Sequence, residues 1–278
     1  MSRNHKVSKY DYDILWSNCT AFGCTLIIMT EKTISGIGVW QEIEGEAIPG
    51  FTRVPSDEIS DYFGGKTEGL VGLDLGSGSG RSTEVLKKAL GCQVYALDLS
   101  SRGLKNTDTE VKIQATGEAL PFPDNHFDFV YLCGVMTNIV SRIPEISEIN
   151  RRQVASEILR TLKPGGIIAV SDFSSDHSLT HYPVNYERHK LITNEYGTIA
   201  VFETKQKITF RGKTDDEVKA LADSPYLVRF AHHYNPDELT RIFESVGFEN
   251  PKHSMELGTT ANATPIENII FVASKPSK

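Results

Sequence analysis

Residues 71–81 read Val71-Gly72-Leu73-Asp74-Leu75-Gly76-Ser77-Gly78-Ser79-Gly80-Arg81, and this stretch decides the fold. Its first half is a short apolar run typical of a buried strand, and its second half carries three alternating glycines. Because glycine lacks a Cβ atom, the backbone can turn sharply there and a ligand can lie against it, facing the free amides of the helix that follows. The stretch therefore predicts a strand, a tight ligand-binding turn and a helix.

The spacing of these glycines disfavours a dinucleotide cofactor. A turn that binds a pyrophosphate has the pattern G-x-G-x-x-G, and the position that would complete this pattern is Arg81. The carboxylate of Asp74, at the end of the predicted strand, also suits a ligand with an ammonium group better than one with phosphates. A small molecule other than NAD is therefore expected at the turn.

Strand and helix patterns alternate from about residue 70 to 173, which is typical of an α/β domain with a mainly parallel sheet. We expect strands at 70–75, 93–98, 111–115, 127–133 and 167–173, helices at 81–90 and 149–162, and a turn at 164–166. Further on, Asn235 is expected to cap a helix that runs to Gly247, with Pro236 in its first position and Glu238 completing a capping box. Two closing strands are expected at 248–255 and 268–273, joined as a hairpin.

These patterns divide the chain into four parts. Residues 66–173 form the core, and 235–278 complete its sheet. Residues 1–65, which contain Tyr10, Tyr12 and Trp16, precede the core, and 174–234 are too long for a plain connection. We interpret both segments as caps over the carboxyl edge of the sheet, where open α/β folds bind ligands.

Composition argues against several classes of protein. The chain has 278 residues and a net charge of −7, which disfavours a nucleic-acid partner because phosphate binding needs a basic face. The longest apolar run near the N-terminus, 21–29, is too short to span a bilayer, so no membrane association is expected. The four cysteines lack zinc-like spacing, and reduced thiols in a cytoplasmic protein without a metal are expected. The oligomeric state stays open.

Four stretches, in order, resemble class I methyltransferases that use S-adenosylmethionine, in particular the small-molecule, methyltransferase-11-like group. They are the glycine-rich residues 73–80; Asp98, 22 residues after Gly76 at the end of the second strand; Thr116-Gly117-Glu118-Ala119-Leu120-Pro121-Phe122 with Phe127-Asp128; and residues 157–166. The resemblance covers roughly 66–173, and the closing helix and hairpin extend it to the C-terminus. It implies a Rossmann-like seven-stranded sheet, mostly parallel with an antiparallel closing strand, plus cap elements, and S-adenosylmethionine as cofactor.

The resemblance also implies which residues hold the cofactor. Asp98 is expected to accept hydrogen bonds from both ribose hydroxyls, and Asp74 with the glycine turn to hold the amino-acid end. The expected cofactor-binding residues are Asp74, Gly76, Ser77, Gly78, Arg81, Ser82, Asp98, Leu99, Thr116, Gly117, Glu118, Ala119 and Cys133. The adenine is expected against Leu99, Ala119 and Leu120. Thr116 stands where the family often has Asp, so backbone contacts from 117–119 could read the adenine amine instead. Asp98 alone could also be a strand-end carboxylate that binds a neighbouring amide.

Methyl transfer depends mainly on aligning the nucleophile, the methyl group and the sulfur. A general base helps when the acceptor is a hydroxyl or an ammonium, and the candidates are His232, His233 and Tyr234, just before the Asn235 cap. Such histidines often only pack, so a structural role stays open. We expect methyl transfer to a small-molecule acceptor enclosed by the cap. The alternatives are a methyltransferase acting on tRNA or another macromolecule, a non-catalytic cofactor-binding protein, and a dinucleotide enzyme on a related fold.

Overall fold

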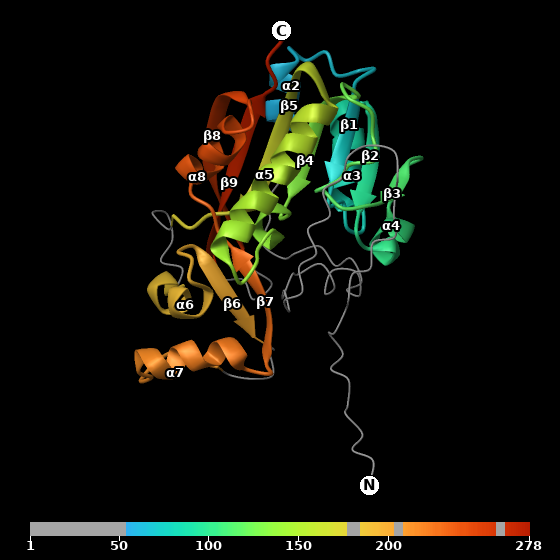
Figure 1. Ribbon diagram of the computed structural model, residues 1–278. Coiled ribbons are helices and arrows are strands. Elements are labelled where there is room, and N and C mark those ends of the chain that lie inside the picture. Colours follow the sequence, from blue (N-terminus) through green and yellow to red (C-terminus); the bar gives the residue numbers. More distant parts are fainter. Residues whose placement is uncertain (1–53, 177–183, 203–207, 260–264) are drawn as a thin grey trace, which may run out of the picture.

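A seven-stranded sheet forms the centre of the computed structural model, which describes residues 54–176, 184–202, 208–259 and 265–278 (Figure 1). Its strands are β1 (Val71–Leu75), β2 (Gln93–Asp98), β3 (Lys112–Gln114), β4 (Phe127–Cys133), β5 (Leu162–Phe173), β8 (Glu249–Thr259) and β9 (Pro265–Ser274). They lie in the order β3-β2-β1-β4-β5-β9-β8, and only β9 runs antiparallel to its neighbours. The expected mostly parallel sheet with an antiparallel closing strand is confirmed.

The strand order reverses beside β1, which pairs with β2 on one side and with β4 on the other. Open α/β sheets bind ligands at the carboxyl ends of the strands next to such a reversal. The glycine turn at 76–80 follows β1 directly. The topology therefore puts this turn at the position where a ligand is expected.

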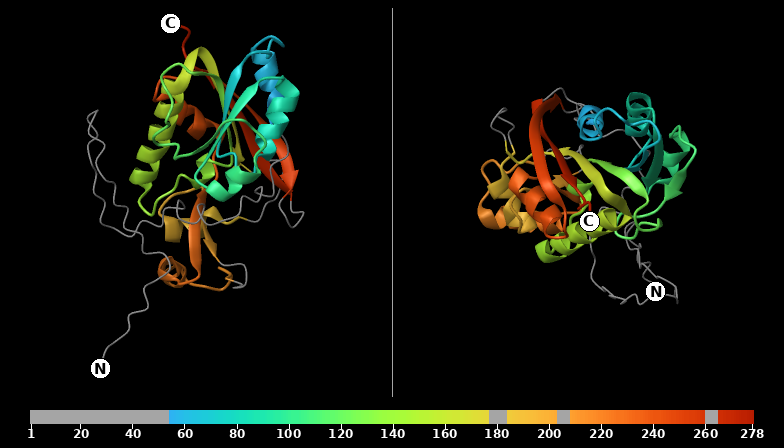
Figure 2. Two further views of the ribbon diagram at one scale, coloured as in Figure 1. Left: turned by 90° about the vertical axis from the view of Figure 1, so that its right-hand side faces the viewer. Right: turned by 90° about the horizontal axis from the view of Figure 1, so that it is seen from above.

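Helices cover both faces of the sheet (Figure 2). They are α2 (Ser56–Tyr62), α3 (Arg81–Leu90), α4 (Ser101–Asn106), α5 (Pro144–Thr161) and α8 (Pro236–Glu244), with the 3-10 turn η1 (Met136–Asn138) after β4. One hydrophobic cluster joins α5 and α8 to the face that carries Leu73 and Leu75. A second cluster joins α2 and α3 to the opposite face, which carries Phe129. None of the described helices combines the length and the apolar character that crossing a bilayer requires.

Several local expectations are confirmed and others are wrong. Helix α3 spans 81–90 as expected, and Asn235 caps α8 by accepting the amide of Glu238. Helix α5 begins at Pro144 instead of 149, and α8 ends at Glu244 before Gly247. Residues 164–166 form an irregular part of β5 and not a separate turn, because β5 already pairs with β4 at Leu162 and regains regular pairing at 167.

Residues 184–202 and 208–234, called the inserted unit below, form a small layer of their own between β5 and α8. Its elements are α6 (Tyr186–Thr193), β6 (Thr198–Phe202), α7 (Asp215–Lys219), the 3-10 turn η2 (Ala220–Asp223) and β7 (Leu227–His232). Strands β6 and β7 pair antiparallel, and Ala200 and Phe230 pack with Val140 and Ile192 in a separate hydrophobic cluster. Figure 1 shows this unit beyond the carboxyl ends of β4 and β5.

The expected N-terminal cap lies mostly outside the described residues, since these begin at 54. Its described end, α2, packs at the edge of the sheet that is opposite the carboxyl ends of the parallel strands. The hydroxyl of Tyr62 donates to the carbonyl of Gly165, near the start of β5, and Ile59 is fully buried against the α3 face. This part of the segment therefore does not cover the carboxyl edge.

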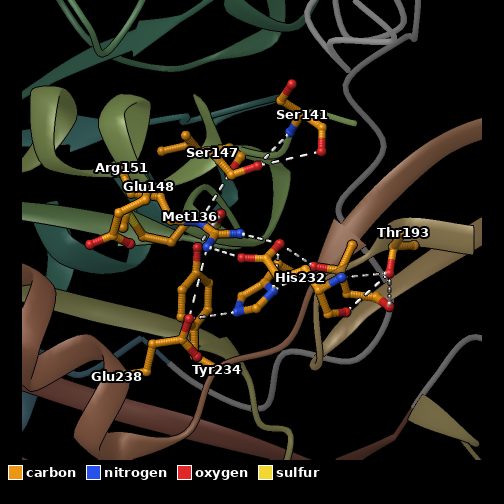
Figure 3. A network of polar contacts seen from close by, with 12 residues as sticks. Met136, Ser141, Ser147, Glu148, Arg151, Thr193, His232, Tyr234 and Glu238 are labelled. Atoms are coloured by element: carbon orange, nitrogen blue, oxygen red, sulfur yellow. Dashed lines mark hydrogen bonds and ion pairs between the residues drawn. The ribbon is translucent and has the colours of Figure 1, made fainter. Parts of the chain in front are cut away.

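A buried ionic network ties the inserted unit to the core (Figure 3). Arg151 of α5 is only 1% exposed, and its guanidinium donates to both carboxylate oxygens of Glu195 at 2.7 and 3.2 Å. The carboxylate of Glu238 on α8 lies 3.8 Å from the same guanidinium. Such a charge is tolerated in the interior only when it is paired and hydrogen-bonded, so these contacts fix three elements relative to one another.

His232 completes this network. Its Nδ1 lies 2.7 Å from the hydroxyl of Thr198, and its Nε2 lies 2.9 Å from the carboxylate of Glu238. The expected capping box at Glu238 is wrong, because that carboxylate turns to His232 and Arg151 instead of the helix start. Oxygen and nitrogen atoms of Glu195, His232 and Glu238 lie within 4.8 Å of one another, a spacing that a metal ion could bridge, but Arg151 already supplies the positive charge there.

Replacing Arg151 with methionine should lower the free energy of unfolding by about 3–5 kcal/mol, because two largely buried carboxylates lose their cation. Urea denaturation measures this change. The matched control is Arg152→Met, one residue along α5, which removes only an exposed pair with Glu148 and should cost less than about 1 kcal/mol. Equal losses in the two variants would contradict the role assigned to the network.

Candidate active site

The glycine turn presents bare backbone at the end of β1. Gly76 donates its amide to the carbonyl of Leu97 on β2, and a Cβ atom on Gly76 would overlap the side chain of Val135. A Cβ atom on Gly78 would meet none of the described residues within 4 Å, although Gly78 has φ +53°. Close packing therefore explains glycine at Gly76, whereas Gly78 leaves open space against the backbone, as a bound ligand requires.

Asp74 is fully buried beneath this turn. Its Oδ2 accepts hydrogen bonds from the hydroxyls of Ser82 at 2.7 Å and Thr83 at 2.6 Å, both at the start of α3. Its Oδ1 has no hydrogen-bond partner among the described residues. Burial raises the pKa of Asp74 to about 6, against the opposing effect of the two hydroxyls, and the nearby carboxylate of Asp98 raises it further. A buried acceptor without a donor costs about 1–3 kcal/mol, so the site is suited to a ligand that brings one.

Asp98, at the end of β2, is tied to the glycine turn. Its Oδ2 accepts the amide of Gly78 at 2.8 Å, and its Oδ1 accepts the amide of Ser100 at 2.7 Å. The carboxylate thus bonds neighbouring amides, as the alternative interpretation of Asp98 required. Each carboxylate oxygen has two lone pairs, so both keep capacity for a further donor.

The third sequence stretch lies beside Asp98. The amide of Ala115 donates to the carbonyl of Asp98, and Thr116 accepts the amide of Glu118 through its hydroxyl at 3.4 Å. Burial raises the pKa of Glu118. Leu99, Thr116, Gly117 and Glu118 are half-buried, and Ala119 is exposed.

Leu120 does not join this group, because it is 4% exposed and packs in the core beneath α5. The expectation that it faces the adenine has no support from this packing. A long-range contact holds Leu120 in this position, since its amide donates to the carboxylate of Glu157 on α5.

The remaining expected cofactor residues lie in different environments. Ser77 is buried, with no partner for its hydroxyl in the described part of the chain, and Ser82 contacts Asp74. Arg81 is exposed at the first position of α3. Cys133 ends β4, and burial raises the pKa of its thiol to about 12, which makes it an inert packing group.

The three candidate general bases point in two directions. His232 and Tyr234 both enter the buried network, where the Tyr234 hydroxyl donates to the carbonyl of Met136 at 2.8 Å and Arg151 lies over its ring. His233 does not enter it. Its Nδ1 lies 2.7 Å from the hydroxyl of Tyr186, and its ring is 5.3 Å from that of Phe173 at the end of β5.

Sequence reasoning missed the segment that follows β4. The carboxylate of Asp172, at the end of β5, accepts the amide of Thr137 at 3.0 Å, and Asn138 donates its side-chain amide to the carbonyl of Gly134 at 2.6 Å. Burial raises the pKa of Asp172 to about 7, opposed by backbone hydrogen bonds. The available signal was an Asp at or next to the end of an apolar strand, as Asp98 is at the end of β2 and Asp172 is next to the end of β5.

Comparison with known proteins agrees with this geometry. Residues 73–170 match the family described as a methyltransferase domain. The chain is 27% identical over 202 residues to the ubiquinone/menaquinone biosynthesis C-methyltransferase UbiE of Shewanella pealeana, covering 68% of this chain and 70% of that protein. It is 28% identical over 197 residues to the protein of the same description from Shewanella oneidensis, covering 66% and 68%.

The fold is also similar to a solved structure of an S-adenosylmethionine-dependent methyltransferase from Methanosarcina mazei. The TM-score is 0.59 at 22% sequence identity, and the match covers 76% of this chain and 94% of that one. At this level of identity the likeness concerns the fold alone. The family match over residues 73–170 and the related sequences, together with the ordered motifs, support a class I S-adenosylmethionine-dependent methyltransferase.

Proposed function

We propose that the protein transfers the methyl group of S-adenosylmethionine to a small-molecule acceptor bound between the glycine turn and the inserted unit. The observation that carries the proposal is the inserted unit itself, which the buried Arg151 network holds beyond the carboxyl ends of β4 and β5. Such an anchored layer favours a bounded site over the open, basic surface that a nucleic acid needs. The names of the similar Shewanella proteins, which refer to ubiquinone and menaquinone biosynthesis, also support a small acceptor.

The residues around the glycine turn fit the methyl donor. The unpartnered Oδ1 of Asp74 suits the ammonium of the amino-acid end, and the open space at Gly78 admits a ligand against the backbone. Asp98 keeps acceptor capacity for the ribose hydroxyls after bonding Gly78 and Ser100. When bound, S-adenosylmethionine supplies a methyl group already activated on a sulfonium.

The other proposed contacts with the methyl donor are assigned from the places of the residues around the glycine turn. Arg81 and Ser82, at the start of α3, are assigned to the carboxylate of the donor, with Gly76 and Ser77 of the turn beside them. Leu99, Thr116, Gly117, Glu118 and Ala119 are assigned to the adenine side, next to Asp98, and Cys133 to the wall at the end of β4. The chain's contribution to catalysis in this proposal is alignment, which can supply much of the rate enhancement of a displacement reaction.

Of the three candidate general bases, only His233 is assigned to the acceptor side. His232 and Tyr234 are occupied by the network, which favours a structural role for both. His233 lies against Phe173 and Tyr186, on the side of β5 where an acceptor could approach.

The acceptor class can be tested with radiolabelled S-adenosylmethionine and a fractionated extract of the source cells. We expect the label to enter the organic-soluble small-molecule fraction, and not RNA or protein, because the acceptor site is bounded by the inserted unit. A parallel incubation with the Asp98→Ala variant controls for labelling by other enzymes. Label found mainly in RNA would contradict the proposal.

Replacing Asp98 with alanine should weaken binding of 5′-methylthioadenosine about tenfold or more, because a charge-assisted hydrogen bond to the ribose is worth roughly 1.5–3 kcal/mol. Calorimetry with this ligand and with its 2′,3′-dideoxy analogue separates that loss from loosening of the turn. In the variant the two ligands should bind equally, whereas the native protein should prefer the hydroxylated one. A preference that survives the substitution would show that the ribose is held elsewhere.

Affinity for S-adenosylmethionine should fall as the pH is lowered through 6, because burial raises the pKa of Asp74 to about 6 and the ammonium prefers the ionised carboxylate. Below that pKa the loss approaches about tenfold per pH unit. The donor's own α-carboxyl and α-amino groups, with pKa values of roughly 3.5 and 8, keep their charges between pH 5 and 7. Calorimetry across this range measures the slope. In Asp74→Asn the affinity should be lower and independent of pH, and an unchanged slope there would assign the titration to another group.

A further inference from the structure

Residues 134–138, which follow β4 and are called the β4 turn below, lie between the glycine turn and the inserted unit. On one side, Val135 packs so closely on the glycine turn that a Cβ atom on Gly76 would lie 2.3 Å from its Cγ2 atom. On the other side, the carbonyl of Met136 accepts the hydroxyl of Tyr234, which belongs to the buried network of the inserted unit (Figure 3). A displacement of the β4 turn would therefore disturb the packing of the glycine turn.

A buried carboxylate on the neighbouring strand holds the β4 turn in place. Asp172, one residue before the end of β5, accepts the amide of Thr137 through Oδ2 at 3.0 Å and the amide of Phe173 through Oδ1 at 2.8 Å. Because Asp172 is fully buried, water cannot readily replace either contact. The position of the β4 turn therefore depends on this side chain.

The contact with the β4 turn depends on the ionised form of Asp172. A carboxylate accepts hydrogen bonds through both oxygens, whereas a protonated carboxyl group turns one oxygen into a donor. Burial raises the pKa of Asp172 to about 7, against the opposing effect of hydrogen bonds from the amides of Phe173, Thr137 and Met136. Near neutral pH, binding of a proton thus weakens the hold on one of these amides.

Other ionisable groups lie around Asp172 and have to be separated from it in any pH profile. They are Cys133 of β4, Tyr234 after β7, Arg151 of α5, Glu238 of α8 and Glu267, which precedes by two residues the β9 partner of Asp172. Burial raises the pKa of Cys133 to about 12 and that of Tyr234 well above its usual range, and an arginine stays charged, so these three keep their charge states near neutral pH. A variant at Asp172 separates its titration from those of the two glutamates.

We propose that Asp172 is a positioning residue for the methyl donor, because its bond to Thr137 holds the β4 turn against the glycine turn before the donor binds. When this bond is lost, the β4 turn has to be ordered again on binding, which weakens the affinity of the donor site about three- to tenfold. This inference rests on the proposed function, since it concerns the residues proposed to hold the adenosine part of the donor.

Calorimetry with 5′-methylthioadenosine tests the inference on the whole protein, because this ligand has no ammonium group to pair with Asp74. At about pH 8, Asp172→Asn should bind it about three- to tenfold more weakly than the native protein, since an asparagine side chain accepts through one atom only. Toward about pH 6 the native affinity should fall to that of the variant, whose own affinity should change little. Asp216→Asn is the matched control, because it removes an exposed carboxylate of α7 and should behave like the native protein at every pH.

Hydrogen exchange in the native protein tests the same contact without a variant. NMR measures the protection of each amide, corrected for the intrinsic pH dependence of exchange. The protection of Thr137 should fall several-fold from about pH 8 to about pH 6, as Asp172 takes up a proton. The amide of Gly134 is the reference, because it donates to the backbone carbonyl of Ser171 and should keep its protection. Constant protection of Thr137 would overturn the inference even where Asp172→Asn does not fold.

The outcomes of the calorimetry separate this inference from the proposed function. No binding of 5′-methylthioadenosine to the native protein at any pH would refute the proposed function. Binding that is equal in the native protein and Asp172→Asn would refute only the positioning role. A variant that binds more weakly but keeps the native pH profile would also refute it, because Asp172 would then have a structural role unrelated to its charge.

Discussion

Both faces of the central sheet are covered by helices, and this constraint decides where function can lie. The strands are apolar because each face packs against α5 and α8 or against α2 and α3. Polar side chains of the central strands therefore gather mainly at the strand ends. Asp98 ends β2, and Asp74 and Asp172 each lie one residue before the carboxyl ends of β1 and β5. The three carboxylates thus gather at one edge.

Each of these carboxylates organises backbone at that edge before any ligand arrives. Asp98 fixes Gly78 and Ser100, and Asp172 fixes the turn after β4 through Thr137. Bonds of this kind lower the cost of binding because the loops need not be ordered later. Asp74 differs, since it keeps one oxygen without a partner among the described residues. A ligand with a cationic group gains most at that oxygen, where the protein has left an acceptor unsatisfied.

Sequence predicted well those features that depend on neighbours in the chain. The turn after β1, the helix at 81–90 and the Asn235 cap all follow from local rules for glycine, apolar spacing and capping. Two of the errors share a different cause, because each involves a partner far away in the sequence. Glu238 was expected to close a capping box, but its carboxylate serves His232 and Arg151. Likewise, β5 begins at Leu162 because β4 is available to pair with it, which the local pattern at 164–166 does not reveal.

The same difference between local and long-range contacts explains which parts of the candidate site could be predicted from the sequence. The residues proposed to hold the methyl donor were readable because they follow directly from strand ends and glycine spacing. The contact between Arg229 and Asn138 was not readable, because these residues meet only after the inserted unit has docked on α5 and α8. That docking depends on Arg151, a buried cation whose partners come from two other parts of the chain. The buried charges hold the inserted unit in place independently of its exposed residues, so under the proposed function those residues can change without altering the proposed donor site.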